Sequence, residues 1–305
     1  MENAGILDCL LAERGGAGCA GRMDQDRHYR GRIAPTPSGY LHLGHARTFW
    51  IAGERASGGI LILRNEDLDA DRCRPEYTEA MVEDLRWFGF NWEEGPDVGG
   101  PYGPYEQSGR NHFYLHAWGM LQDLGYIYPS PHSRRDVTEA LRAPHGPDTE
   151  PVFPKELRPA PGSWRPTGDP GEMNWRFRVR DGEAITFVDG RVGETTFVAG
   201  RDFGDFLVWR KDGFPSYDLA VAVDDHAMLI TEVVRGEDLL LATARQLLLF
   251  RALGWASPQY YHVPLLCDAN GTRLAKRHDA LSLRRLREEG CSPEQLRGEF
   301  FKEAK

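Results

Sequence analysis

The sequence lacks the long apolar run, roughly 20 residues, that a helix needs to cross a bilayer. Its first residues place acidic side chains around one short apolar stretch, a pattern unlike that of a secretory signal. No membrane partner is expected, and a cytoplasmic location is predicted for the protein.

Cysteine is scarce, and its spacing shows no pairing. There are five cysteines, and no two of them form a Cys-x-x-Cys pair. An odd, scattered set indicates reduced thiols rather than a disulfide framework. The cysteines are Cys9, Cys19, Cys73, Cys267 and Cys291.

Basic residues are fewer than acidic ones: the sequence has 37 Lys and Arg and 46 Asp and Glu, which gives a net charge of −9. Indiscriminate nucleic-acid binding depends on basic side chains that neutralise phosphates, so this composition argues against it. The composition is still compatible with the binding of one specific nucleic acid through a local basic patch. The chain of 305 residues, with 41% hydrophobic and 27% charged residues, is otherwise typical of a globular protein with one large or two ordinary domains.

The first third of the chain alternates strand and helix signals. A short strand is expected from Gly31 to Ala34, and the prolines that follow it require a loop. The pattern then predicts a helix over 42–57, a buried strand in the apolar run GILILR and a second helix over 76–88. This order is typical of the start of a doubly wound α/β fold.

Composition changes in the middle of the chain. Pro, Gly and charged residues dominate 129–171, and the stretch 175–198 alternates with Gly-containing turns, which predicts short antiparallel strands. Long apolar elements resume after Phe214, and LLATARQLLLFRALGW predicts an amphipathic helix. The middle therefore reads as an insertion between two halves of an α/β sheet.

The stretch RIAPTPSGYLHLGHA contains two histidines, His42 and His45, on either side of Leu43-Gly44. A metal site would need further ligands, and no HExxH motif or Cys cluster supplies them. Both histidines could also be ordinary residues at a helix start. The third interpretation is a phosphate site, because the free N–H groups and the positive end of a helix attract anions. Gly44 would let a ligand approach the backbone, and both imidazoles could donate hydrogen bonds to phosphate oxygens.

This stretch resembles the first signature of the class I aminoacyl-tRNA synthetases, His-Ile-Gly-His, in its glutamyl version. The second signature of that family is a Lys-Met-Ser-Lys-Ser loop, and the chain offers RLAKR at 273–277. Further stretches that resemble the glutamyl branch are LRNEDLDADRCRPEY, GPDVGGPYGPYEQS, SYDLAVAVDD, VVRGEDLLLATARQ and YHVPLLCDANG, so the resemblance covers about residues 30 to 290.

The resemblance implies a Rossmann-like doubly wound parallel sheet with an inserted α+β subdomain and a short helical C-terminal region that contacts the tRNA stem. The expected division is 1–29 as a disordered extension, 30–115 as the first half of the catalytic domain, 116–205 as the inserted subdomain, 206–257 as the second catalytic half, and 258–305 as the signature loop and C-terminal helices.

The family reaction joins the carboxylate of glutamate to the α-phosphate of ATP, and the resemblance implies ATP with Mg²⁺ as substrate. Fixed donors and cations would stabilise the charge that develops at phosphorus. By position, His42, Gly44 and His45 would hold the α-phosphate region, and Lys276 would neutralise pyrophosphate. Arg273 stands where the family often has Lys, and Ala275 replaces the usual Ser, so the geometry of this loop departs from the family pattern.

Recognition of L-glutamate requires a cation for each carboxylate and an acceptor for the ammonium group. The resemblance assigns the two carboxylates to Arg32 and Arg235 and the ammonium to Glu66. It places three further residues in the lining of the same pocket: Ala34, Thr36 and Tyr217. The alternative for Arg235 is a surface ion pair with one of the acidic residues that follow it.

Many relatives hold a structural zinc in the insertion, through a Cys-x-Cys pair and then a Tyr and a Cys. Here Ser130 and His132 occupy the first two positions, and Phe153 and Leu157 the second two. Ser, Phe and Leu are not competent zinc ligands, so no metal is predicted. Ordinary packing, to which Phe153 and Trp164 could contribute, would hold the insertion.

The chain ends at Lys305, soon after the second signature, whereas a full glutamyl enzyme continues into an anticodon-binding domain. A shorter branch of the family lacks that domain and transfers glutamate to the queuosine base in the anticodon of tRNA(Asp). This activity, in a monomer, is the expectation. Two alternatives remain: a truncated enzyme that charges tRNA(Glu), and a weakly active paralogue that binds tRNA or a nucleotide.

Overall fold

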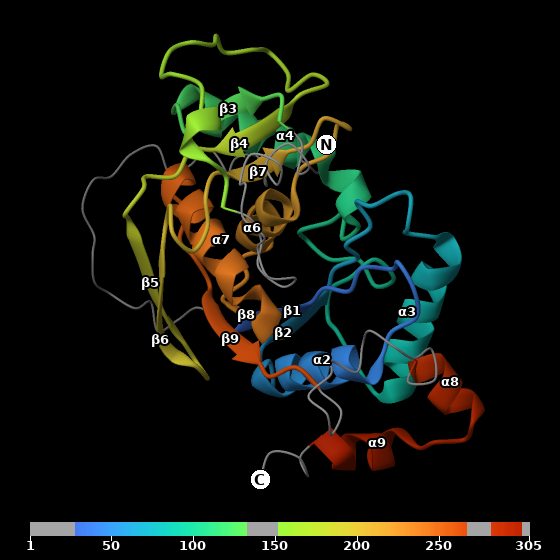
Figure 1. The fold of residues 1–305 in the computed structure, drawn as a ribbon. Helices are drawn as coiled ribbons and strands as arrows, with labels where there is room; N and C mark the ends of the chain where they lie inside the picture. The colour runs from blue at the N-terminus through green and yellow to red at the C-terminus, as the bar shows by residue number, and fades with distance from the viewer. Residues whose placement is uncertain (1–27, 133–151, 267–281, 301–305) are drawn as a thin grey trace. The chain divides into compact units, whose positions relative to one another are not determined.

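The computed structural model describes residues 28–132, 152–266 and 282–300 (Figure 1). By contacts the chain forms two compact units. The first takes its described residues from Met1–Gly109, Met228–Asp238 and Pro258–Lys305, and the second from Arg110–Ala227 and Leu239–Ser257. These boundaries differ from the predicted limits of the insertion, whose assignment as a subdomain stays a prediction. The predicted extension over 1–29 lies outside the described residues, apart from its last two.

The first unit is built on parallel strands. Strand β1 (Arg30–Ile33) pairs with β2 (Ile60–Leu63), and β8 (Glu232–Gly236) pairs with β9 (Gln259–Val263). The backbone N–H of Thr231 donates to the carbonyl of Arg30 at 2.9 Å, which brings the start of β8 beside β1. Parallel strands joined through helices define an α/β fold, so the predicted fold class is confirmed.

Helices of the first unit begin and end where the sequence patterns indicate. Helix α2 (Leu43–Arg55) follows the proline loop, and α3 (Pro75–Phe88) begins with Pro at its first position, where the missing N–H has no cost. Helix α3 ends at Gly89, which has φ 99°, a left-handed conformation that favours glycine. The unit ends with α8 (Leu283–Glu288) and α9 (Pro293–Phe300).

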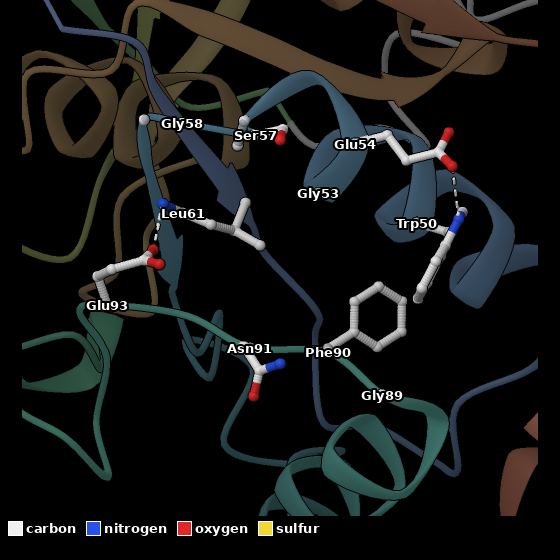
Figure 2. Close-up of a pocket in the computed structure, with 12 residues that line it drawn as sticks. Trp50, Gly53, Glu54, Ser57, Gly58, Leu61, Gly89, Phe90, Asn91 and Glu93 are labelled. Atoms are coloured by element: carbon white, nitrogen blue, oxygen red, sulfur yellow. Dashed lines mark hydrogen bonds between the residues drawn. The ribbon is translucent and has the colours of Figure 1, made fainter.

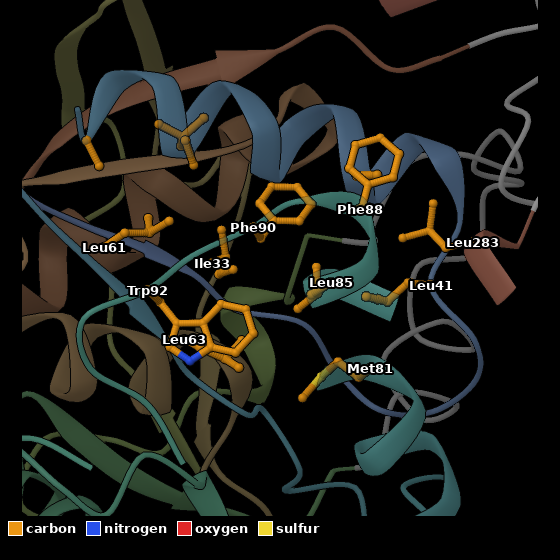
Figure 3. Close-up of a cluster of buried hydrophobic side chains, with 14 of the residues drawn as sticks. Ile33, Leu41, Leu61, Leu63, Met81, Leu85, Phe88, Phe90, Trp92 and Leu283 are labelled. Atoms are coloured by element: carbon orange, nitrogen blue, oxygen red, sulfur yellow. The ribbon is translucent and has the colours of Figure 1, made fainter. Parts of the chain in front are cut away.

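One apolar cluster holds these elements together (Figure 3). Ile33 and Leu63 from the strands are fully buried, and they pack with Leu85 and Phe88 from α3. Leu283 of α8, also fully buried, belongs to the same cluster. Burial of each such side chain contributes about 1.5–3 kcal/mol, so the cluster fixes the strand ends that carry the candidate site.

The second unit combines antiparallel strands with helices. Its three-stranded sheet has the order β3-β4-β7, and β5 and β6 form a hairpin. The short antiparallel strands predicted over 175–198 are therefore confirmed as β4, β5 and β6. The strands are β3 (Ile127–Ser130), β4 (Asn174–Phe177), β5 (Ala184–Asp189), β6 (Gly193–Val198) and β7 (Phe206–Trp209).

Three helices of the second unit pack on one another: α4 (Asn111–Asp123), α6 (Tyr217–Ala227) and α7 (Leu240–Leu253). An ion pair between Arg110 and Asp224 links the start of α4 to α6, with 2.6 Å between Nε and Oδ1, and neither side chain is exposed. Tyr114 also donates to Asp224 at 2.9 Å. The described residues also include three short 3-10 helices: η1 (Gln107–Arg110), η2 (Lys155–Leu157) and η3 (Glu237–Leu239). Across the described ranges, no helix is both long and apolar enough to span a bilayer.

Candidate active site

The two signature histidines lie at the start of α2. His42 is the N-cap, with extended backbone, and its N–H donates to Nδ1 of His45 at 3.4 Å. The ring centroids are 5.8 Å apart, and the ring of His45 stacks on Phe49. A ring that accepts through Nδ1 carries its proton on Nε2, so Nε2 of His45 is the donor that a phosphate oxygen needs.

The first turn of α2 suits an anion. It contains no acidic residue, so the positive end of the helix is not neutralised from within. A Cβ placed on Gly44 would meet no atom within 4 Å, which leaves open space over the backbone at this point. The geometry therefore favours the phosphate interpretation of the two histidines over a metal site.

Chain segments on either side of 267–281 return to α2. Nη1 of Arg47, in α2, donates to the carbonyl of Pro264 at 3.1 Å. On the other side, the N–H of Leu283 donates to the carbonyl of Leu41 at 2.7 Å, and Ser282 forms a β-bridge with His42. The predicted residues Arg273, Ala275 and Lys276 lie outside the described residues.

The predicted glutamate ligands of the first unit gather at the carboxyl ends of its strands. Arg32, in β1, is 4% exposed, and its Nη1 donates to the carbonyl of Val234 in β8 at 3.2 Å. Glu66 follows β2, and its N–H donates to the carbonyl of Pro35 at 3.0 Å. Glu66 is thereby joined to the loop that carries half-buried Ala34 and exposed Thr36.

Arg64 is a member of this group that sequence reasoning did not single out. Its Nη2 donates to Oε1 of Glu66 at 3.0 Å, and its side chain is fully buried. A buried guanidinium stabilises the ionised carboxylate, because an opposite charge favours the charged form. The signal in the sequence was a cation between an apolar strand and Glu66.

Arg235, in β8, is buried as well, with 4% exposure, so its side chain is not at the surface. Its Nε donates to Nε2 of His262 at 3.2 Å, and its guanidinium carbon lies 5.4 Å from the centre of the Tyr260 ring. Sequence reasoning did not find His262, because its partner is 27 residues away along the chain.

Three buried guanidinium groups lie at this end of the first unit. Arg32, Arg64 and Arg235 stand there with Glu66, and the four side chains are at most 7% exposed. Guanidinium groups pair with carboxylates in bidentate fashion, which fits a carboxylate ligand at this end. Tyr217, the remaining predicted ligand, begins α6 in the second unit and is 43% exposed. Its role stays a prediction.

A separate cavity of about 300 Å³ lies at the amino end of β2, the end opposite Arg64 (Figure 2). Figure 2 shows Leu61 and Phe90 between two carboxylates. Glu54 accepts a hydrogen bond from Trp50, and Glu93 accepts one from the N–H of Leu61. Carboxylates repel phosphate, so these two side chains disfavour an anionic ligand in the cavity.

Three of the four positions that were compared with zinc ligands surround one arginine, Arg176. Nε of Arg176 donates to Oγ of Ser130 at 3.3 Å, and its Nη2 donates to the carbonyl of His132 at 3.4 Å. The guanidinium carbon lies 4.2 Å from the centre of the buried Phe153 ring. Within 28–132, 152–266 and 282–300, no three His, Cys, Asp or Glu side chains are grouped as metal ligands. Leu157, the fourth position, ends η2.

Comparison with known proteins agrees with this geometry. The catalytic-domain model of the class I tRNA synthetases (E and Q) matches residues 28–301. The Glutamyl-Q tRNA(Asp) synthetase of Symbiobacterium thermophilum is 48% identical over 275 residues, which cover 88% of this chain and 84% of that protein. Glutamate–tRNA ligase 2 of Acidithiobacillus ferrooxidans is 41% identical, with 88% of this chain and 56% of the ligase covered.

Solved structures give the same relationship. The glutamate tRNA ligase of Elizabethkingia meningosepticum, crystallised in complex with its amino acid, superposes with a TM-score of 0.71 at 30% identity. The match covers 87% of this chain and 53% of that ligase, so the chain spans about half of the larger protein. The chain therefore belongs to the family of class I tRNA synthetases (E and Q), as a form of their catalytic domain.

Proposed function

We propose that the protein activates L-glutamate with ATP and transfers the glutamyl group to the queuosine base in the anticodon of tRNA(Asp). The observation that carries the proposal is the pairing of two features in one unit. The histidines His42 and His45 stand at a helix start without acidic residues, and Arg32 and Arg235 are buried cations of the same unit. The 48% identity to a Glutamyl-Q tRNA(Asp) synthetase supports this acceptor over tRNA(Glu).

In the first step, a carboxylate oxygen of glutamate attacks the α-phosphorus of ATP, and pyrophosphate leaves. Nε2 of His45 and the N–H groups of the first turn of α2 would donate to the α-phosphate oxygens as negative charge builds up there. ATP enters as its Mg²⁺ complex, and Lys276 and Arg273 would balance the charge of pyrophosphate. The products are glutamyl-adenylate and pyrophosphate.

Glutamate is oriented by charge. Arg32 and Arg235 would each pair with one carboxylate, and Glu66 would accept from the α-ammonium group. The ion pair between Arg64 and Glu66 would hold the Glu66 carboxylate in place for that contact. Ala34 and Thr36 would line the pocket. In the second step, a nucleophilic group of the queuosine base attacks the activated carbonyl, and AMP leaves.

Two assays test the proposal. Glutamate-dependent exchange between ATP and labelled pyrophosphate is expected without any tRNA. Labelled glutamate is then expected on tRNA(Asp) that carries queuosine, and not on the same tRNA with unmodified guanosine at that position. The matched pair of tRNA(Asp) preparations isolates the base as the acceptor.

Each alternative gives a distinct result. Transfer to tRNA(Glu) in place of tRNA(Asp) would identify a glutamate–tRNA ligase and overturn the proposed acceptor. Exchange that is absent with every amino acid, together with retained tRNA binding, would identify a binding paralogue. A parallel reaction with glutamine checks that the second carboxylate is required.

A further inference from the structure

His262 faces Arg235 directly across two neighbouring strands. The parallel register of β8 and β9 pairs Arg235 with His262, so both side chains project from the same face of the sheet. The two nitrogens are 3.2 Å apart, His262 is fully buried, and Arg235 is 4% exposed. A buried hydrogen bond between two long side chains restricts both of them.

The chemistry of the pair fixes the state of the imidazole. A guanidinium group only donates, because it stays protonated in proteins and has no acceptor. Nε2 of His262 must therefore accept, which requires a neutral ring with its proton on Nδ1. A protonated ring would place a second cation beside Arg235 and remove the bond.

The bond to Nε controls the plane of the guanidinium. A carboxylate that binds an arginine in bidentate fashion must lie in that plane, so a rotation of the group misdirects both donors. The ring of Tyr260, two residues before His262 on the same strand face, stacks on His262 with centroids 6.1 Å apart. That ring also lies 5.4 Å from the guanidinium carbon, which limits movement on one side.

We propose that His262 is a positioning residue for substrate recognition: its neutral imidazole holds the Nε of Arg235 and so presets the guanidinium for a carboxylate of glutamate. The inference rests on the proposed function, since it requires Arg235 to bind glutamate. His262 itself does not touch the substrate. Its effect is to reduce the ordering that binding would otherwise require.

The test measures glutamate-dependent ATP–pyrophosphate exchange for His262→Leu and His262→Gln. Loss of one buried hydrogen bond is expected to raise the KM for glutamate about tenfold in His262→Leu. The kcat should change much less, because the contact is the same in ground and transition states. The KM for ATP should not change. His262→Gln retains an acceptor at a similar distance from the backbone, so it should restore most of the glutamate affinity.

Val263→Ala provides a control for stability. Val263 is the next residue of β9 and is 1% exposed, so its truncation weakens the same strand without touching Arg235. Its KM for glutamate should match that of the unaltered protein. An equal rise in KM for Val263→Ala and His262→Leu would overturn the inference, because general loosening of β9 would then explain both.

The outcomes separate the two proposals. Absence of glutamate-dependent exchange in the unaltered protein overturns the proposed function and the inference with it. Exchange with an unchanged glutamate KM in His262→Leu overturns the inference alone. The ¹⁵N chemical shifts of the His262 ring give a check that needs no variant: a protonated Nδ1 and a bare Nε2 support the inference, and a protonated Nε2 overturns it.

Discussion

The backbone N–H of Leu283 donates to the carbonyl of Leu41 at 2.7 Å, immediately before the first signature histidine. This bond joins the chain that follows the second signature to the chain that precedes the first. Both leucines are buried in the apolar cluster of the first unit, so the connection is shielded from water. Ser282 and Leu283, which follow the second motif in the sequence, are therefore anchored beside the start of α2.

Replacement of His45 by Ala should lower the kcat of ATP–pyrophosphate exchange about 100-fold, because it removes a donor aimed at charge that develops in the transition state. The KM for glutamate should stay nearly unchanged, since the proposed glutamate ligands are the arginines and not this ring. Steady-state exchange kinetics with glutamate and ATP varied separately measure both quantities.

His112→Ala is the matched control for His45→Ala. His112 is also an exposed residue in the first turn of a helix, α4, but it belongs to the second unit. Its substitution should leave kcat unchanged. If His45→Ala instead raised the KM for glutamate at constant kcat, the ring would belong to the amino-acid pocket and not to the phosphate site.

Replacement of Arg235 by Lys should raise the KM for glutamate about tenfold or more although the positive charge is kept. An ammonium group cannot offer the planar pair of donors that a carboxylate accepts, and it loses the Nε contact with His262. The same exchange assay measures the effect. Arg201→Lys, which alters an exposed arginine paired with Asp202, should have no effect.

Individual strands and helices could be predicted from the sequence, because their patterns depend on residues that are close together in the chain. The apolar run of β2 and the period of α2 depend on neighbouring residues, and their predicted limits lie within two residues of the observed ones. The predicted ligands Arg32 and Glu66 lie in one unit at strand ends that a βαβ order brings together.

The contacts that complete the site could not be predicted in this way. The pairing of Arg235 with His262 depends on the register of two strands, and no periodicity in the sequence specifies which strand becomes the neighbour. The same applies to Arg176, which is 46 residues from Ser130. The sequence has no zinc ligand at Ser130 or Phe153, but it does not specify that Arg176 contacts both residues.

Replacement of Arg176 by Met should destabilise the second unit, whereas chelation should not. Arg176 is 6% exposed and donates to Ser130 and to the carbonyl of Asp205, so its loss leaves buried acceptors unsatisfied. A decrease of about 1–3 kcal/mol in the free energy of unfolding is expected. Urea unfolding followed by tryptophan fluorescence measures it.

The matched treatment is EDTA on the unaltered protein, which should leave the unfolding curve unchanged. A shift of the curve to lower urea after chelation, reversed by Zn²⁺, would show that a metal contributes to stability and would contradict the prediction from Ser130 and Phe153.

Replacement of Asp84 by Asn should stabilise the protein at neutral pH. Asp84 lies in α3 with no exposure, and burial raises the pKa of its carboxyl above the usual 3.8, although Arg284 in α8, 3.5 Å away, opposes the shift. A raised pKa means that the folded protein binds this proton more tightly than the unfolded chain does. The contribution of Asp84 to stability therefore falls as pH rises from about 4 through its folded pKa. Asn does not ionise, so Asp84→Asn avoids this loss of stability.

Urea unfolding of both proteins between pH about 4 and 7 tests the sign: the advantage of Asp84→Asn should be smallest at the acidic end and grow with pH. Asp181 provides the opposite case, because its hydrogen bonds from Arg158 lower the pKa of its carboxyl. Its contribution is present above the usual pKa and is lost as pH falls, so Asp181→Asn should be less stable at neutral pH, with a deficit that disappears in acid. An advantage of Asp84→Asn that shrank with rising pH would mean that Arg284 outweighs burial and that Asp84 is ionised at little cost.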